Sequence, residues 1–218
     1  MQNARNKNLL KNKAYNYIKS KILNCEYMPN ELINEVLICE EIGDISRTPV
    51  RDALSHLEQE GLVTIIPKKG SFVVGLNYAD LNQLYEARSL LEPYAIKKYG
   101  HLIPKENLKQ FKKEFLASAK HDTDFSYDLD DKFHMTIINS TNNVYFKHDY
   151  KRINDSNQRF RIISGKTKAS NIKKANSEHV EIINACLKKN WDLAAELMLK
   201  HLESSRISAM ESFIDGGA

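Results

Sequence analysis

The first 75 residues carry a pattern of apolar positions that predicts three helices. The first helix ends before Pro29, because the residue before a proline disfavours helical geometry. Its apolar stripe consists of Ala14, Ile18, Ile22 and Cys25. A second, short helix is predicted to start at Asn30, with Leu32 and Ile33 near its entry, and to close at Gly43. The third is predicted to begin with Ser46 as its N-cap and to end at Gly61.

β-branched and aromatic residues follow, in the pattern typical of strands. Residues 62–66 and 71–74 flank the turn 67–70, which predicts a two-stranded hairpin with a basic tip. Three helices and such a hairpin form a winged helix-turn-helix, and we expect this DNA-binding domain to span residues 1–75.

Everything from Tyr78 onward has helical periodicity, interrupted by Gly, Pro, Asn and Asp. The predicted helices cover residues 78–99, 104–121, 124–139, 143–163, 168–189 and 191–214. Six antiparallel helices of this length form a bundle that can enclose a pocket. The predicted fold class is mainly α, with an N-terminal winged helix-turn-helix (three helices plus a β-hairpin) followed by an all-α six-helix bundle over residues 80–218.

The composition is that of a globular protein, with 42% hydrophobic and 28% charged residues among 218. No apolar run approaches the ~20 residues that cross a bilayer. The basic N-terminal segment lacks the apolar core and cleavage site of a secretory signal. The three cysteines form no CxxC pair, which fits free thiols in a reducing compartment. We therefore expect a cytoplasmic protein.

The third predicted helix has a polar face suited to DNA. If its apolar stripe is buried, Arg47, Thr48 and Arg51 point outward near its N-terminal end. A recognition helix presents that end to base edges in the major groove, where arginine can donate two hydrogen bonds to guanine. The arginines alone could merely solubilise a surface helix, but the helix-turn-helix and the basic tip favour DNA. The predicted DNA-binding residues are Ser46, Arg47, Thr48, Arg51, Lys68, Lys69 and Gly70.

Residues 18–73 resemble the DNA-binding domain of the GntR family of bacterial transcription regulators. The resemblance rests on the segment SRTPVR, the apolar stripe after it, the EGL terminus and the wing glycine. It implies that Arg47, Thr48 and Arg51 contact operator DNA and that Gly70 lets the wing backbone approach it. The chain departs from the family pattern in two places. Asp44 is an extra residue in the turn, which could shift the recognition helix, and Asn30 replaces the usual glycine after Pro29, a mild change because Asn accepts positive φ.

Three histidines and one aspartate fall on inward faces of three predicted helices. Asp130 and His134 are four residues apart and share one face, while His179 and His201 lie on the apolar stripes of two other helices. Any one of these histidines taken singly is more often a hydrogen-bonded core residue. Together they are hard to satisfy by mutual hydrogen bonds, because a neutral ring offers one donor. A divalent cation would accept their lone pairs and balance the carboxylate.

The region from about residue 80 to residue 207 resembles the FCD effector domain that accompanies many GntR regulators. The matching segments are EARSLLEPYAIKKYG, DLDDKFH and EHVEIINACLKKNWDLAAELMLKHL. The resemblance implies that Asp130, His134, His179 and His201 ligate a metal such as Zn²⁺, Ni²⁺ or Mn²⁺. It also implies that a small carboxylate often completes the coordination.

Arg88 is the first candidate for binding that carboxylate. It shares an apolar stripe with Leu81, Leu84, Leu91 and Ala95. An inward guanidinium is costly unless it is paired, either with Glu92 one turn later or with an anionic ligand. The resemblance favours the ligand, since arginine binds carboxylates in a planar fork. Asn157 and Arg161 lie on or near the inward side of another helix, where they are either further effector-binding residues or ordinary core residues.

These features predict a transcription regulator, specifically a repressor, rather than an enzyme. We expect a homodimer on a pseudo-palindromic operator, with its affinity modulated by a small carboxylate at the metal site. The alternative is a direct sensor of a divalent metal without an organic effector. A metalloenzyme is a third hypothesis, since Asp and three His could activate water. It would leave the DNA-binding unit unexplained, and no inward acid or base other than Glu92 is evident.

Overall fold

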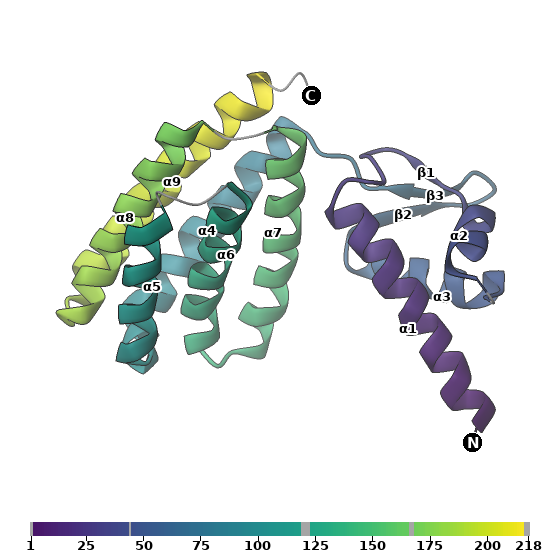
Figure 1. Cartoon of the computed structure of the whole chain (residues 1–218), viewed down its shortest axis with the longest axis horizontal. Helices are drawn as coiled ribbons and strands as arrows, with labels where there is room; N and C mark the ends of the chain where they lie inside the picture. Colours follow the sequence, from purple (N-terminus) through teal and green to yellow (C-terminus); the bar gives the residue numbers. More distant parts are fainter. Residues whose placement is uncertain (1, 44, 119–122, 166–167, 216–218) are drawn as a thin grey trace. The chain divides into compact units, whose positions relative to one another are not determined.

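The computed structural model describes residues 2–43, 45–118, 123–165 and 168–215 (Figure 1). The chain divides into two compact units, Met1–Leu76 and Asn77–Ala218, each with its own hydrophobic core.

The N-terminal unit is a winged helix-turn-helix. Its elements are α1 (Gln2–Leu23), β1 (Leu32–Ile33), α2 (Glu35–Ile42), α3 (Arg47–Gln59), β2 (Val63–Ile66) and β3 (Gly70–Val73). Helix α1 packs on α3, and one core holds Ala14, Ile18 and Ile22 of α1 with Val50, Ala53, Leu54 and Leu57 of α3. Cys25, the last member of the first predicted stripe, lies beyond the end of α1. Gly61 has a φ of 76° just beyond the end of α3, as expected of a residue that closes a helix.

The start of the second helix differs from the prediction. Leu32 and Ile33 form strand β1, which pairs antiparallel with β3 and places Leu32 opposite Phe72. The sheet therefore has three strands in the order β1–β3–β2, and the predicted hairpin is part of it. Helix α2 is capped by Asn34, whose side chain accepts hydrogen bonds from two backbone N–H groups. A two-residue strand is too short to show a period, which explains the error.

The two departures from the family pattern have different outcomes. Asn30 adopts a φ of 67°, so the expected tolerance of asparagine for positive φ is confirmed. Asp44 lies outside the described residues, and its effect on the recognition helix stays a prediction. Ser46 occupies the N-cap position of α3 but makes no capping hydrogen bond with its side chain.

The C-terminal unit is a bundle of helices. They are α4 (Tyr78–Tyr99), α5 (Lys105–Ala117), α6 (Thr123–Ser140), α7 (Val144–Ile163), α8 (Ala169–Leu187) and α9 (Trp191–Asp215), with a 3₁₀ turn at Gly100–Leu102. The predicted end of the second of these helices, at residue 121, lies outside the described residues. Helix α4 packs against α6, α7 and α9, while α8 packs against α5 and α9. This arrangement brings α4, α6, α8 and α9 around one interior.

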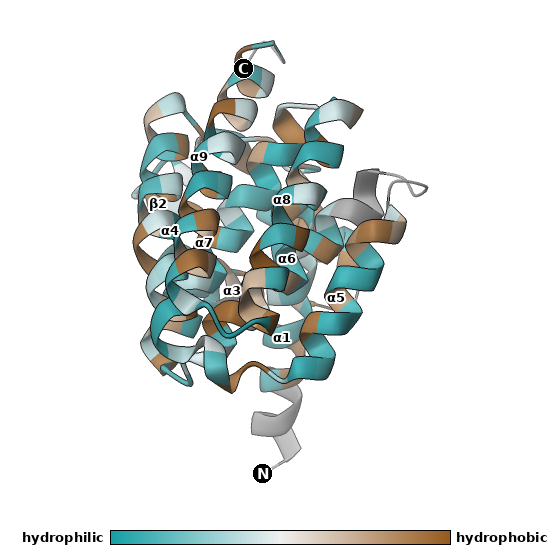
Figure 2. Ribbon diagram, turned by 90° about the vertical axis from the view of Figure 1, so that its left-hand side faces the viewer, coloured by the Kyte–Doolittle hydropathy of each residue, from teal (hydrophilic) through white to brown (hydrophobic). Residues whose placement is uncertain are grey.

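Hydrophobic and hydrophilic segments alternate along these helices (Figure 2), as amphipathic helices require. Among the described helices, none combines the length and the apolar character needed to cross a membrane. The bundle interior holds Phe133, Ile137, Ile182 and Met198, all at most 1% exposed. Polar side chains that share this interior therefore need partners.

Candidate metal centre

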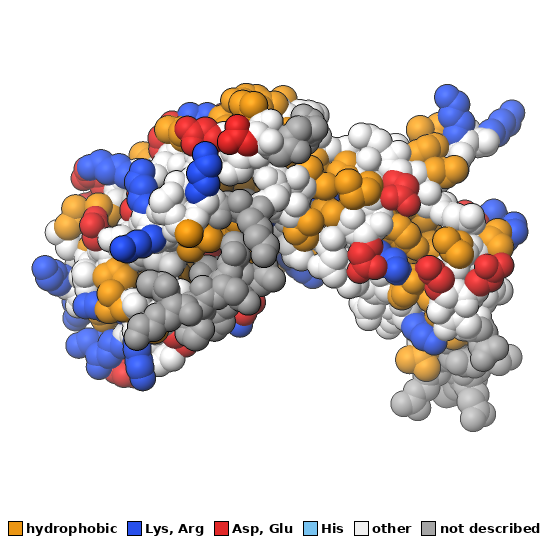
Figure 3. Space-filling view, turned by 45° about the horizontal axis from the view of Figure 1, so that its top comes forward, with side chains coloured by type: hydrophobic (Ala, Val, Ile, Leu, Met, Phe, Trp, Pro, Cys, Tyr) orange, Lys and Arg blue, Asp and Glu red, His pale blue; other side chains and the backbone are white. Residues whose placement is uncertain are grey.

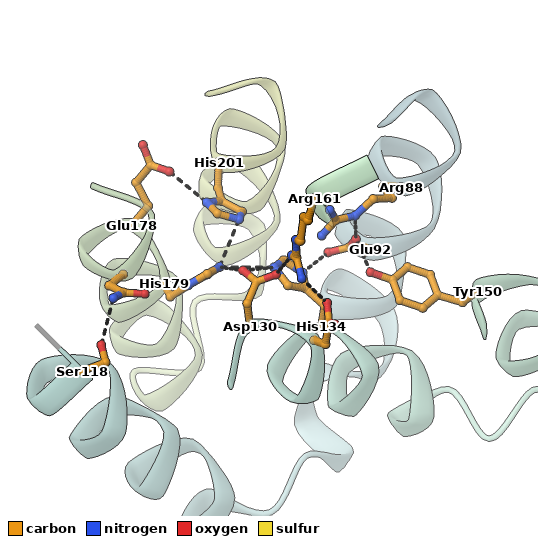
Figure 4. A network of polar contacts seen from close by, with 12 residues as sticks. Arg88, Glu92, Ser118, Asp130, His134, Tyr150, Arg161, Glu178, His179 and His201 are labelled. Carbon is orange, nitrogen blue, oxygen red and sulfur yellow. Dashed lines mark hydrogen bonds and ion pairs between the residues drawn. The ribbon is translucent and has the colours of Figure 1, made fainter. Parts of the chain in front are cut away.

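The four predicted metal ligands meet at one point in the bundle. Asp130 and His134 come from α6, His179 from α8 and His201 from α9 (Figure 4). One ligand atom from each lies within 4.8 Å of the others, and the three imidazoles are at most 2% exposed. The Nε2 atom of His179 lies 3.2 Å from that of His134 and 3.0 Å from that of His201. The Asp130 Oδ1 atom lies 3.5 Å from His134 Nε2 and 3.3 Å from His179 Nε2.

These separations suit a divalent cation. Nitrogen and oxygen ligands lie about 2.0–2.2 Å from zinc, which puts neighbouring ligand atoms roughly 2.8–3.6 Å apart in tetrahedral or octahedral coordination. Three clustered imidazole nitrogens would otherwise have to share protons among themselves. A ligand set of imidazoles and a carboxylate, without thiolate, can bind Zn²⁺, Ni²⁺ or Mn²⁺. The residues present therefore fit the predicted metal without selecting one.

Two carboxylates orient two of the three histidines through contacts with their Nδ1 atoms. The Nδ1 atom of His134 lies 2.5 Å from Glu92 Oε2, and that of His201 lies 2.8 Å from Glu178 Oε2. Such contacts favour the tautomer that turns the Nε2 lone pair toward a metal. The Nδ1 atom of His179 has no hydrogen-bond partner among the described residues. Neither glutamate could be assigned this role from the sequence, because neither lies on the same helix as the histidine it contacts.

Glu92 is the most heavily bonded of these groups. It is fully buried, and its Oε1 accepts hydrogen bonds from Arg88 Nε (2.8 Å) and from the Tyr150 hydroxyl (2.6 Å). Burial would raise the pKa of Glu92, but the charges of Arg88 and His134 lower it to about 2. Burial likewise would lower the pKa of His134, whereas Glu92 and Asp130 raise it to about 9.

Arg88 is thus paired with Glu92, the intramolecular partner that was expected one turn later on the same helix. Within the described part of the chain, its only hydrogen bond uses Nε, so the two terminal nitrogens donate to no protein group. The guanidinium is buried and lies 5.3 Å from the ring centre of Tyr85. Pairing with Glu92 therefore leaves the two terminal nitrogens of the Arg88 guanidinium available to a second anion.

Arg161 pairs directly with Asp130, one of the four candidate metal ligands. Its Nη2 contacts Asp130 Oδ2, and its Nη1 donates to Asp131 Oδ1 at 2.8 Å. Burial would raise the pKa of Asp130, but Arg161 and His134 hold it well below its usual value. The carboxylate is thereby kept ionised. The helical pattern placed Arg161 near the interior but did not reveal this partner, which lies on the neighbouring helix α6.

A cavity of about 270 Å³ adjoins the centre, and residues of α4, α6, α7, α8 and α9 line it. The predicted effector residues Arg88, Asn157 and Arg161 all line this cavity, together with Asp130 and His201. Asn157 is 3% exposed, and its amide makes no hydrogen bond within the described ranges. Two of the four metal-ligand candidates thus share one cavity with the three effector candidates.

The N-terminal unit presents the predicted DNA-contacting residues on its surface. Arg47, Thr48 and Arg51 are exposed on α3, whereas Val50 and Leu54 on the opposite face are buried. Ser46 is exposed at the start of the same helix. Arg51 Nε donates to Glu35 Oε2 on α2 at 2.8 Å. The polar face of α3 is thus open at its N-terminal end.

The tip of the β2–β3 hairpin is basic and tightly turned. Lys68 and Lys69 are exposed, and Lys68 adopts a φ of 64°. Gly70 has a φ of 116°, a conformation that L-residues rarely adopt. Figure 3 shows basic side chains projecting from this unit. The tip therefore presents two exposed lysines on a turn whose backbone conformation favours glycine.

Two family models match the chain. The model described as bacterial regulatory proteins, gntR family, matches residues 10–73, and the FCD domain model matches residues 83–204, more than half of the chain. The chain is a GntR-family transcription regulator with an FCD domain. The regulator therefore binds DNA, and its families and relatives are transcription regulators rather than enzymes, as predicted.

Known proteins resemble the regulator over most of its length. The HTH-type transcriptional regulator YdhC of Bacillus subtilis (strain 168) is 29% identical over 195 residues, covering 86% of this chain and 85% of YdhC. A GntR transcriptional regulator from Rhodococcus sp. RHA1 has a TM-score of 0.77 at 18% identity, covering 92% of this chain and 97% of its own. The Zn²⁺-bound FCD domain of TM0439 has a TM-score of 0.54 at 20% identity, covering 65% of this chain and 96% of its own. The two structures support the fold.

Proposed function

We propose that this regulator binds operator DNA as a homodimer and that a small carboxylate, held beside a divalent metal in the helical unit, changes its operator affinity. The observation that carries this proposal is the sharing of one cavity by two sets of groups. One set is Asp130 and His201 of the candidate metal centre, and the other is Arg88 with Asn157.

The metal would be held by Asp130, His134, His179 and His201. Glu92 and Glu178 support this role, since they set the tautomers of two of the histidines. When bound, the metal would supply a fixed positive charge that attracts a carboxylate. Arg88 would donate from its terminal nitrogens to the same carboxylate, and the buried amide of Asn157 would bond another polar atom of the ligand.

In the N-terminal unit, α3 would contact base edges through Arg47, Thr48 and Arg51. Lys68 and Lys69 would contact phosphates beside the wing. Two-fold symmetry of the dimer would match a pseudo-palindromic operator. Such a regulator acts in the cytoplasm, where bacterial operators are found. The ligand can act only through its different affinities for the DNA-competent and DNA-incompetent forms. A coupling of about 1–3 kcal/mol, roughly 5–150-fold in operator affinity, is typical.

The first test is native mass spectrometry of the purified regulator, which reports subunit number, metal and any co-purified small acid. Fluorescence anisotropy on the operator, with metal present and a panel of small carboxylates added, then measures coupling. We expect at least one acid to change the operator affinity fivefold or more. An affinity unchanged by every acid would contradict the effector role. Higher expression of the controlled gene after deletion of the regulator would support repression.

Direct metal sensing is the second candidate function. Four protein donors can close the coordination of a metal such as zinc without an added ligand, and the described residues supply four. Titration of metal against operator binding, with no organic acid present, separates the two functions. A sensor responds as metal is titrated, whereas a structural metal remains bound throughout.

A further inference from the structure

One ion pair joins helix α3, which carries the proposed base contacts, to the helix before it. The Nε of Arg51 on α3 donates to the Oε2 of Glu35 on α2 at 2.8 Å. The side chain of Arg51 is 65% exposed, whereas that of Glu35 is 23% exposed. The carboxylate is thus mostly covered by the protein, while the guanidinium that it bonds extends from the surface of α3.

The backbone around Glu35 is fixed at two points. Glu35 is the first residue of α2 and directly follows the N-cap Asn34, whose side chain accepts hydrogen bonds from two backbone N–H groups. Further along α2, Ile38 lies in the core that also holds Val50, the neighbour of Arg51 on α3. A carboxylate on a backbone fixed in this way can set the direction of a guanidinium that is bonded to it.

The hydrogen bond with Glu35 uses only one nitrogen of the Arg51 guanidinium. The two terminal nitrogens donate to no other group among the described residues. Such a pair of nitrogens can donate to O6 and N7 of guanine in the major groove. An arginine that is oriented in advance loses less conformational freedom on binding than one that is not.

Arg47 provides a comparison within the same helix. It precedes Arg51 by four residues, so both lie on the exposed face of α3. Arg47 makes no side-chain hydrogen bond within the described ranges. Two like charges four residues apart on a helix repel each other, and Glu35 offsets that repulsion at Arg51. Arg51 is therefore oriented before DNA is bound, whereas Arg47 is not.

Glu35 also has an ordinary structural explanation. A carboxylate in the first turn of a helix interacts favourably with the helix dipole. An exposed ion pair by itself contributes little to stability. Neither effect would make the preference for one base depend on Glu35. The base preference at single operator positions therefore distinguishes the two explanations.

We propose that Glu35 is a positioning residue for DNA recognition, which orients Arg51 so that its terminal nitrogens face a guanine in each half-site of the operator. The carboxylate acts through Arg51 and not by touching DNA. This inference rests on the proposed contact of Arg51 with base edges, and it adds the residue on which the base preference of that arginine depends.

The test is the selection of bound duplexes from a random-sequence library by the full-length regulator, followed by sequencing, which gives the base preference at each position. We expect Arg51→Ala to lose the preference for guanine at one position of each half-site. Glu35→Ala should weaken that same preference about 2–12-fold, the effect of ordering one long side chain at an interface, and leave the other positions unchanged. Glu35→Gln still offers an acceptor to Nε and should retain more of the preference than Glu35→Ala.

Two controls show whether the effect passes through Arg51. Glu40→Ala removes an exposed carboxylate from the same helix and should change no preference. In the Arg51→Ala background, Glu35→Ala should have no further effect on any preference. Affinity for random DNA should not fall in Glu35→Ala, because the loss of a negative charge does not weaken attraction to phosphates.

The possible failures are distinguishable. If Arg51→Ala loses a guanine preference and Glu35→Ala keeps it, the proposed contact of Arg51 stands and the role of Glu35 is wrong. If Glu35→Ala weakens binding to all duplexes alike, or still changes preferences in the Arg51→Ala background, Glu35 acts on the fold or on DNA directly, and the inference is overturned. If Arg51→Ala keeps every preference of the parent, the proposed base contact is itself wrong, and this inference with it.

Discussion

Glu92 on α4 and His134 on α6 are joined through Oε2 and Nδ1, although 42 residues separate them in the chain. The same glutamate accepts a hydrogen bond from Arg88 through its other oxygen. One buried carboxylate therefore contacts both a candidate metal ligand and the candidate anchor of the effector. Metal and carboxylate binding are expected to influence each other through it, and by linkage each would change the affinity of the other by the same factor.

Replacing Glu92 with Gln should weaken metal binding about 10–100-fold, the usual effect of removing a carboxylate that orients a histidine ligand. The variant should also unfold more easily, because Arg88 would lose its buried counter-charge. Competition with a chromophoric chelator measures the metal affinity. Glu86→Gln, on the exposed side of α4, is the control. Equal affinities in the two variants would exclude the orienting role.

Metal should stabilise the folded regulator through all four ligands. Zinc at about a thousand times its Kd would add about 4 kcal/mol to the free energy of unfolding, because it binds the folded chain alone. Chelation should remove this gain, and His179→Ala should abolish it. Differential scanning calorimetry with and without zinc measures the effect. His148→Ala, exposed on α7, should still respond like the parent; if His179→Ala does too, His179 is no ligand.

Arg47→Ala and Arg51→Ala should each lose about 1–3 kcal/mol of discrimination between operator and random DNA. Both side chains are exposed on α3, so the fold should be retained. Anisotropy titrations on both duplexes at one fixed salt concentration provide the measurement. Lys105→Ala, in the helical unit, serves as the control. A variant that matched the parent on both duplexes would rule out base contact by that arginine.

Gly70→Ala should destabilise the N-terminal unit by about 1–3 kcal/mol, because alanine is strained at a φ of 116°. The new Cβ would also lie 2.8 Å from Leu32 Cδ1, although that exposed side chain can move aside. Urea denaturation measures the loss, with the exposed Ser55→Ala as the control. Zinc affinity should be unchanged. Unaltered stability would mean that the wing turn can relax around an alanine.

Helical periodicity accounts for much of what could be predicted. It places Asp130 and His134 on one face because they are one turn apart on the same helix. It also separates the exposed Arg47 and Arg51 from the buried Val50 and Leu54, and both assignments agree with the burial in the structure. Strand β1 escaped prediction because two residues carry no period and its partner, β3, lies about forty positions later.

Periodicity assigns a residue to a face of its helix but says nothing about which residue of another helix it meets. The approach of His179 and His201 to 3.0 Å, the contact of Glu92 with His134, and the pairing of Arg161 with Asp130 all join different helices. Each depends on how far one helix slides and turns against its neighbour, and side-chain packing across the whole bundle sets that. The residue types of the site could therefore be predicted from the sequence. Their partners and the cavity beside them are determined only by how the helices pack.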